Sequence, residues 1–421
     1  MTIKLGLALP ALLFGMSRVF ASDSGGSFAA DEWRSYVEQM APLGENMTAL
    51  MADPEDRNLR EEVYRALMAG ASCGFIGLSL GDPEHPDFFP WLSNAYNFWA
   101  LSPDGVYYLA PIDGDGVYEI SGYRGTVHMS DIQVSGGGIV PPHGTGHLGP
   151  TFANYDIAKL KADKDGAFEA ILSAERPVGY EGNWLPLDRH ATNILIRQFA
   201  YDWLHEVDGR FAIQRLDRPA IKPRPNADQI HKQLRMVSSW AEAMVRIGLK
   251  RTKMYEDKGL VNKLIVNELK GVGGIDGQEY IEGLFDLKPD EALIYETDVP
   301  THCRYWNIQL TDMMWSAIDY VNRQSHLNGY MAKIDRDGKF RAVISASDPG
   351  VPNWLDTAGY NKGAVLGRWT ECSSFPVPTI TKVSLAEIRQ YLPADTPTVT
   401  AEQRDAAIRL RRKGAQLRRR W

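Results

Sequence analysis

One phrase occurs twice in this chain. Residues 163–185 begin DKDGAFEAILSA and end in NWL, and residues 335–355 begin DRDGKFRAVISA and end in NWL. The copies start 172 residues apart (163 to 335) and end 170 apart (185 to 355), so the second copy has lost two loop residues. An arginine follows each copy, Arg197 and Arg368. A duplication at this distance predicts two related modules and excludes a short-period solenoid.

The residue types inside the phrase predict its local structure. Asp-x-Asp-Gly is typical of a tight reversal in which Gly takes a positive φ. The alternating apolar residues that follow predict a strand entering a core. We therefore expect each copy to be a hairpin followed by a loop that ends in Trp184 or Trp354. The asparagines before them, Asn183 and Asn353, are expected either to anchor the loop to backbone or to contact a ligand.

Composition and charge limit the class of protein. At 421 residues, 44% hydrophobic and 24% charged, the chain suits two to three globular domains. Its 11 Trp and 18 Tyr residues suit a core or a pocket for flat apolar ligands. The net charge is −7; subtracting +2 for residues 1–21 and +6 for residues 401–421 leaves about −15 for the body. An acidic body argues against nucleic acid as a partner.

The first 21 residues are typical of a secretory signal. Lys4 precedes a short apolar run, and Val19-Phe20-Ala21 offers a small-residue cleavage site. A periplasmic or secreted location follows, or a cytoplasmic one if this segment is not a cleaved signal. No other stretch is apolar enough to predict a membrane span. Three cysteines exclude a disulfide framework; at most one pair forms, and we expect a buried, inert thiol at each: Cys73, Cys303 and Cys372.

Periodicity divides the chain into six parts. Apolar residues at helical spacing alternate with strand-like runs bounded by Gly and Asp. The predicted parts are a signal peptide (1–21), a helical region (22–94), a first β-sandwich module (95–217), a linker with helices (218–289), a second β-sandwich module (290–380) and a basic helical tail (381–421). The predicted fold class is mainly β with helical additions (α+β), in jelly-roll or immunoglobulin-like sandwiches, because regular βαβ alternation is absent.

Three short motifs carry weak chemical signals. Gly77–Gly81 matches the Gly-x-Ser-x-Gly nucleophile elbow and offers a serine hydrolase through Ser79, but a helical pattern precedes it. The glycines of 271–277 lack the strand that a dinucleotide fingerprint requires, so we expect no nucleotide cofactor. His143 and His147 lie among glycines and prolines, which leaves a metal site, a pocket-edge loop or a plain surface loop open; we expect no metal.

Titratable and aromatic residues gather in both modules. Tyr, Asp and His can transfer protons, and Arg can bind an anion. We predict proton carriers at Tyr320, His326 and Asp312. The predicted substrate-binding residues are Arg323, Asn322, Trp306, Trp354, Tyr108, Tyr123, Arg124 and His128.

The chain resembles proteins with a DUF1214 domain, which often occurs beside DUF1254, over roughly residues 95–380. The matching words include YWxxQLxD (305–312), DPG (348–350), NWL (353–355) and SPDxxY (102–107). Where the family has Arg-Tyr-Ser after an asparagine, this chain has Gln324 in place of the tyrosine. The resemblance implies β-sandwiches, but no settled reaction and no catalytic residues. Such chains are common in bacteria that degrade aromatic compounds and steroids, which hints at the substrate.

Two functions follow as hypotheses. The first is an enzyme without a cofactor that acts by acid–base chemistry on an apolar aromatic or polycyclic molecule bound between the modules. A lyase that cleaves a C–C bond of a lignin-derived dimer is one example. The second is a non-catalytic periplasmic binding or assembly protein. The basic helix at 401–421 is expected to contact the acidic body of the same chain or of a neighbouring copy, forming a homo-oligomer.

Overall fold

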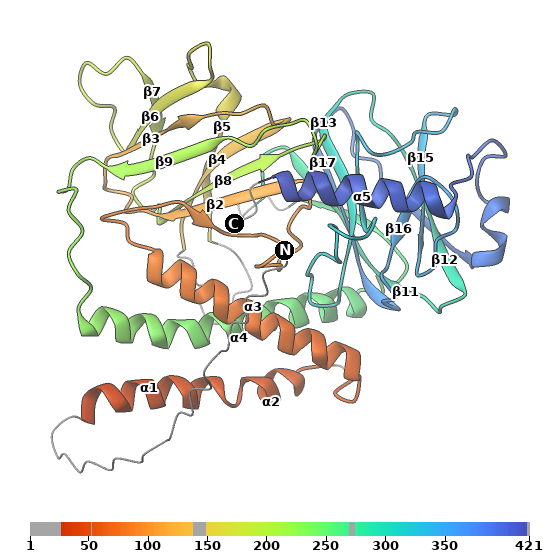
Figure 1. Ribbon diagram of the computed structural model, residues 1–421, viewed down its shortest axis with the longest axis horizontal. Coiled ribbons are helices and arrows are strands. Elements are labelled where there is room, and N and C mark those ends of the chain that lie inside the picture. The colour runs from red at the N-terminus through yellow and green to blue at the C-terminus, as the bar shows by residue number, and fades with distance from the viewer. Residues whose placement is uncertain (1–26, 52, 138–148, 269–273, 419–421) are drawn as a thin grey trace, which may run out of the picture.

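Two β-sandwich modules and a layer of helices make up the protein. The computed structural model describes residues 27–51, 53–137, 149–268 and 274–418. The predicted signal peptide, His143, His147 and residues 271–273 of the glycine run lie outside these ranges. Figure 1 shows module one beside module two, with helices α1 to α4 along one side of both. The predicted fold class, two β modules with helical additions, is confirmed.

The two modules have the same sheet topology. Module one has a five-stranded sheet ordered β1-β2-β8-β4-β5 and a four-stranded sheet ordered β7-β6-β3-β9. Module two repeats both orders, as β10-β11-β17-β13-β14 and β16-β15-β12-β18. The duplication seen in the phrase therefore extends to the whole sandwich.

The strands of module one are β1 (Phe89–Pro90), β2 (Gly105–Pro111), β3 (Tyr118–Tyr123), β4 (Met129–Ser135), β5 (Thr151–Asp156), β6 (Ala167–Ser173), β7 (Asn183–Pro186), β8 (Asn193–Phe199) and β9 (Arg210–Arg215), with a short 3-10 helix η1 (Ile157–Lys159). The strands of module two are β10 (Ile265–Glu268), β11 (Gln278–Asp286), β12 (Glu291–Asp298), β13 (Cys303–Thr311), β14 (His326–Asn328), β15 (Lys339–Ser345), β16 (Trp354–Asp356), β17 (Lys362–Cys372) and β18 (Thr379–Ser384), followed by η2 (Leu385–Gln390).

Each repeated phrase forms a turn, a strand and a returning strand. The strand of the phrase pairs in parallel with the one that carries Asn-Trp-Leu, β6 with β7 and β15 with β16. The turn of each phrase reverses the chain as predicted, because the Asp163 N–H bonds the Ala167 carbonyl and the Asp335 N–H bonds the Lys339 carbonyl, and Ile334 and Phe340 form an antiparallel bridge. The loop after the strand then crosses over and returns in the same direction, which the sequence does not predict. The predicted anchoring role of the asparagine is confirmed. Asn183 bonds the N–H and C=O of Lys161 and the C=O of Glu169, and Asn353 does the same with Lys333 and Arg341.

Alternating apolar residues bury one face of each sheet. In module one the core includes Ile120, Ile132, Phe168 and Ile196, and in module two it includes Tyr295, Ile308, Phe340 and Leu355. The phenylalanine of each phrase therefore fills the middle of its sandwich. The opposite face of each five-stranded sheet is also buried, because it lies against the other module and the helices. That second burial places polar side chains between the modules.

The helical layer joins the modules. It contains α1 (Ser27–Met40), α2 (Leu43–Thr48), α3 (Arg57–Leu80) and α4 (Ala227–Asp257). α3 and α4 pack closely at Gly70, where a Cβ would lie 2.9 Å from the backbone of Ala241. Ser79 lies inside α3, so the strand-to-helix turn that a nucleophile elbow needs is not formed there.

Module two begins earlier in the chain than the sequence predicts. Strands β10 and β11 fall in the stretch predicted as linker and helices (218–289). The sequence of β11 does not indicate a buried strand, because it contains Glu282. The Glu282 carboxylate is completely buried and accepts hydrogen bonds from Tyr255 and Arg251 of α4.

The cysteines also differ from expectation. Cys303 and Cys372 are cross-strand neighbours in β13 and β17 and form a disulfide, so the expected inert thiol is wrong for this pair. Cys73 is a buried free thiol.

The C-terminal helix α5 (Ala401–Leu417) lies across module two and reaches module one (Figure 1). Thr400 and Gln403 form a capping box at its start. Arg404 pairs with Asp348 at 2.8 Å, and Arg418, just after the helix, pairs with Asp208 at 2.7 Å. The expected contact with the acidic body of the same chain is thus present. Within the described ranges, every helix is too short or too polar to cross a bilayer.

Candidate functional site at the module junction

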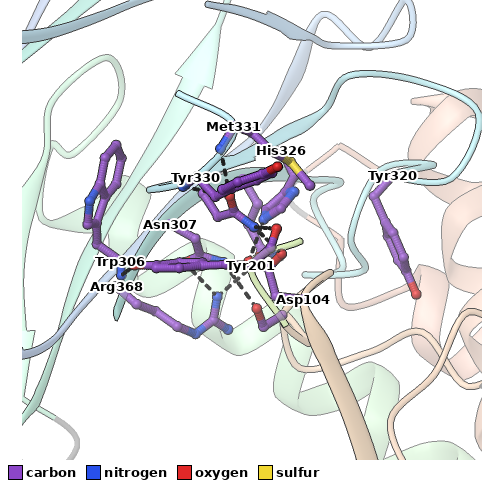
Figure 2. Close-up of polar contacts among 12 residues, drawn as sticks. Asp104, Tyr201, Trp306, Asn307, Tyr320, His326, Tyr330, Met331 and Arg368 are labelled. Atoms are coloured by element: carbon purple, nitrogen blue, oxygen red, sulfur yellow. Dashed lines mark hydrogen bonds and ion pairs between the residues drawn. The ribbon is translucent and has the colours of Figure 1, made fainter. Parts of the chain in front are cut away.

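A completely buried carboxylate, Asp104, lies where the modules meet, immediately before β2. One oxygen accepts hydrogen bonds from Nε2 of His326 at 2.8 Å and from the Tyr305 hydroxyl at 2.7 Å. The other accepts from Nε1 of Trp203 at 2.8 Å and from Nδ2 of Asn328 at 2.7 Å. A buried charge is tolerated only when it is paired and hydrogen-bonded. We call these five residues the Asp104 centre; Figure 2 labels Asp104 and His326.

The C-terminal helix determines the tautomer of His326. Nη2 of Arg411 lies 3.1 Å from Nδ1 of His326, and a guanidinium has no acceptor. Nδ1 therefore accepts, and Nε2 carries the hydrogen that is donated to Asp104. Burial lowers the pKa of His326, which keeps the ring neutral. Burial also lowers the pKa of Arg411, to about 10, although its guanidinium stacks on Trp203 at 4.7 Å.

The charge of Asp104 is held by the same contacts. Burial alone raises the pKa of the Asp104 carboxyl, but His326, Tyr305 and Asn328 outweigh burial, so the pKa lies below its usual value. Burial raises the pKa of the Tyr305 hydroxyl well above its usual value, and the charge of Asp104 adds to this effect. At neutral pH the centre thus contains a carboxylate, a neutral imidazole and a neutral phenol.

A second set of polar contacts holds the segment that carries Asp104. Arg368 of β17 donates to the Ala100 carbonyl at 2.6 Å and to Oε1 of Gln309 at 2.8 Å. Gln309 in turn donates to the Leu101 carbonyl at 2.8 Å. Module two therefore clamps the chain just before the first long strand of module one.

Module one repeats this clamp on module two. In module one Asp131 of β4 pairs with Arg197 of β8, and in module two Asn307 of β13 pairs with Arg368 of β17. Gln133 and Gln309 each lie two residues further along the strand, so they are counterparts. Gln133 donates to the Gly274 carbonyl at 3.0 Å, just before β11. The interface thus has approximate twofold character, with the Asp104 centre in one half only.

The predicted proton carriers do not form one group. His326 lies in the Asp104 centre. Tyr320 is buried with its ring edge against Trp203, and Figure 2 shows it set apart from the cluster. The Asp312 carboxylate accepts the backbone N–H groups of Met314 and Ser316 in the loop after β13, at 2.9 and 2.8 Å.

Asp312 belongs to a different buried pair, with Glu62 of α3. Burial and the charge of Asp312 raise the pKa of Glu62 to about 8. Burial raises the pKa of Asp312 to about 6. Glu62 also accepts the backbone N–H of Met313 at 3.3 Å, so this pair joins the helical layer to module two.

The predicted substrate-binding residues of module two have internal partners. Trp306 is buried in the core of module two beside Phe340 and Trp369. Trp354 donates to the Ser345 carbonyl at 3.1 Å. The other two predicted residues lie nearer the surface. Arg323 pairs with Asp356 at 2.9 Å, and the Asn322 side chain forms hydrogen bonds with Asp319 and Arg412.

The predicted residues of module one are also dispersed. Tyr108 packs half-buried against the core. Arg124 donates to the Ala158 carbonyl at 3.1 Å, and the His128 ring stacks on Tyr201 with centroids 4.1 Å apart. Tyr123 is exposed, with Arg210 lying 4.8 Å over its ring.

Tyr123 lines an open groove of about 740 Å³ on the outer face of the four-stranded sheet of module one. The lining combines aromatic, charged and small residues from β3, β6, β9 and the turn before β6: Ser121, Gly122, Tyr123, Lys161, Ala162, Asp163, Ala167, Phe168, Glu169, Arg210, Phe211 and Ala212. We call it the module-one groove. Among the described residues no cluster of three or more His, Cys, Asp or Glu side chains is arranged to hold a metal ion.

Comparison with known proteins identifies the family. A model described as "Protein of unknown function (DUF1214)" matches residues 149–201 and 286–368, and each region contains one repeated phrase. The chain is a DUF1214-domain protein. No curated protein matches it.

A solved structure shares the fold of this DUF1214-domain protein. An uncharacterized protein from Burkholderia cenocepacia is 26% identical, covers 85% of this chain and 98% of its own, and superposes with a TM-score of 0.78. The VPA0106 protein from Vibrio parahaemolyticus is 12% identical, covers 77% of this chain and 98% of its own, and has a TM-score of 0.45.

Sequence reasoning missed most of the Asp104 centre. Of its five residues, only His326 was predicted. Asp104 and Tyr305 both lie in short sequence motifs shared with DUF1214 proteins, and these motifs could have indicated them as candidate residues. Arg411 had no signal of its own, because it is one of many arginines in the tail.

Proposed function

We propose that this DUF1214-domain protein binds a small molecule with an apolar or aromatic body in the module-one groove. The observation that carries the proposal is the groove itself, whose volume of about 740 Å³ suits a drug-sized ligand. Tyr123 offers an exposed ring face, and the charged side chains around it can orient a polar end.

A binding role is favoured over catalysis because the two features are separate. The groove is open, and Lys161, Asp163 and Glu169 are exposed in it. Asp104, His326 and Tyr305 are instead completely buried, and both oxygens of the Asp104 carboxylate accept hydrogen bonds. Catalytic acids and bases must reach the atoms between which the proton moves. The centre is better explained as the polar junction that holds the modules together.

The test is a ligand panel with two readouts. Purified protein is incubated with lignin-derived aromatic dimers and steroids, its melting temperature is measured, and the compounds are analysed by mass spectrometry. We expect at least one compound to raise the melting temperature and to be recovered unchanged, since binding to the native state stabilises it. The Tyr123→Ala variant should lose this shift, whereas Tyr391→Ala, at another exposed tyrosine, should keep it. An unaltered shift in Tyr123→Ala would exclude the groove.

A second candidate, the acid–base enzyme, is favoured by one observation. Asp104 orients His326 through Nε2, which leaves Nδ1 as the basic atom, as in Asp–His pairs that act as general bases. Nδ1 faces Arg411, so chemistry would require α5 to withdraw. This candidate predicts product formation from the panel, and its rate should rise in Arg411→Met and vanish in Arg411→Met/His326→Ala. Quantitative recovery of every compound from both proteins counts against it.

Location and assembly belong to the same proposal. We propose a periplasmic location, supported by the Cys303–Cys372 disulfide, since such bonds persist in oxidising compartments. Intact mass after alkylation, without and with reduction, tests it in protein recovered from cells. A homo-oligomer through the outer face of α5 is proposed from its exposed Leu410 and Leu417, and sedimentation velocity tests that.

A further inference from the structure

The two modules differ sharply at the position of the module-one groove. Strand register makes the two halves directly comparable: Ser121 lies between Glu169 and Ala212, and Glu296 lies between Arg341 and Thr379. The repeated phrase adds Asp163 and Asp335, Asp165 and Asp337, and Ala167 and Lys339 as counterparts. Module two therefore shows the same surface with its own side chains in the position of the groove.

In module two an arginine occupies the surface. The Arg341 guanidinium bonds Glu296 at 2.6 Å, Asp335 at 2.8 Å and Asp337 at 2.7 Å. Lys339 adds a bond to Glu296 at 2.9 Å. Three carboxylates thus surround one guanidinium, which raises the pKa of Arg341 and lowers that of Asp337 to about 2. These side chains cover the centre of the sheet.

In module one the arginine is missing but two of its acidic partners remain. Glu169 stands in place of Arg341, and small Ser121 and Ala167 stand in place of Glu296 and Lys339. The groove results from this loss of side-chain volume. Asp163 and Asp165 stand at the positions of Asp335 and Asp337. One oxygen of Asp163 accepts the backbone N–H groups of Asp165 and Ala167, and Asp165 lies 3.4 Å from Lys164. Within the described ranges, the Glu169 side chain has no hydrogen bond or ion pair.

The cations that line the groove have contacts of their own. Lys161 Nζ donates to the Glu181 carbonyl at 3.1 Å. Arg210 lies over the Tyr123 ring, which shows that this ring face accepts a guanidinium. Neither replaces Arg341 between the carboxylates of the phrase.

We propose that the ligand of the module-one groove carries an ammonium or guanidinium group that takes the place of the Arg341 guanidinium. The cation lies between Glu169 and Asp163, and the apolar body lies along Tyr123. This inference rests on the proposed function, since it names the ligand class of the same groove. Because the carboxylates are exposed, the contribution of charge is modest, roughly threefold to tenfold in affinity.

The experiment uses three matched aromatic probes on the full chain. Isothermal titration at low ionic strength compares 2-phenylethylamine, 2-phenylethanol and 3-phenylpropionate. The amine is expected to bind about threefold to tenfold more tightly than the alcohol, and the carboxylate more weakly than either. Added salt should reduce the difference between amine and alcohol, because exposed charges are screened.

Three variants locate the effect. Glu169→Gln should bring the amine down to the affinity of the alcohol. Glu169→Arg places an arginine at the position of Arg341, beside Asp163, and should abolish binding of all three probes. Glu55→Gln, at an exposed glutamate outside the groove, should leave every affinity unchanged. Because Glu169 is exposed, these substitutions should preserve the fold, and the melting temperature without ligand checks this.

The outcomes separate the two proposals. If the alcohol or the carboxylate binds as tightly as the amine and Glu169→Arg still blocks them, the cation inference is wrong and the binding function stands. If no probe binds, the cation inference and the proposed groove both fall. If the amine binds equally to wild type and Glu169→Arg, it binds elsewhere and the inference is overturned.

Discussion

Asp104 and His326 are 222 residues apart in sequence, and their side chains meet at 2.8 Å across the junction of the modules. The bond is part of a set in which every contact to the Asp104 carboxylate comes from another segment: the loop after β8, β13 and β14. Arg418 adds a bond from the end of α5 to the Asp104 carbonyl at 2.6 Å. This one residue therefore ties both modules and the C-terminal helix together.

Replacing Asp104 with Asn should destabilise the whole protein. The Asn side chain has the same shape as Asp but carries no charge. Its NH2 group replaces one acceptor oxygen and would face two hydrogen-bond donors. We expect a loss of about 3 kcal/mol in the free energy of unfolding, typical of breaking a buried charged network. Urea denaturation measures it, with the exposed Asp228→Asn as control. A loss below about 0.5 kcal/mol, the range of ordinary surface changes, would refute the structural role.

The two anchoring asparagines offer a matched pair. Asn183→Ala and Asn353→Ala each remove the same three hydrogen bonds. Because Asn353 is buried and Asn183 only half-buried, we expect about 2 to 3 kcal/mol for Asn353→Ala and about 1 kcal/mol for Asn183→Ala. Chemical denaturation of both variants checks the order, and the reverse order would show that burial does not decide the cost.

Stability should fall as the pH rises from about 5 to 9. The folded-state pKa of Glu62, about 8, lies above its unfolded value of about 4.5, so the protonated form is favoured by folding. Its contribution is complete below the unfolded pKa and is lost as pH rises through the folded pKa. Glu62→Gln should therefore flatten the profile and be more stable than wild type at pH 9 by on the order of 2 kcal/mol. Parallel profiles of the two proteins would contradict this.

Gly414 should resist a change that normally favours helices. An exposed Gly→Ala in a helix interior usually stabilises by about 1 kcal/mol. A Cβ at Gly414, however, would lie 2.9 Å from the Trp203 Cβ and 3.2 Å from its backbone. We expect Gly414→Ala to lower the melting temperature by several degrees, while Lys413→Ala on the exposed face of α5 changes it little. An increase for Gly414→Ala would mean that α5 does not pack this closely.

The repeat made much of the fold predictable. It predicted two sandwiches, and strand residues such as Phe168 and Phe340 could be placed in a core because their alternation matches a half-buried strand. Strand β11 was missed because Glu282 is typical of a surface position, and only its contacts with Tyr255 and Arg251 explain its burial. The parallel return of the phrase was missed because a turn signal specifies a reversal and leaves open which strand pairs next.

The sequence by itself determined the duplication, the strand faces and the loop anchors, because these depend on residue types a few positions apart. Only the tertiary structure decided which polar residues meet. His326, Asp104 and Arg411 are ordinary in their own segments and become a centre through contacts over 222 and 85 residues. The module-one groove likewise appears only when Glu169 and Arg341 are compared in register. Burial and charge pairing depend on packing between segments far apart in the sequence, so local sequence patterns predict neither of them.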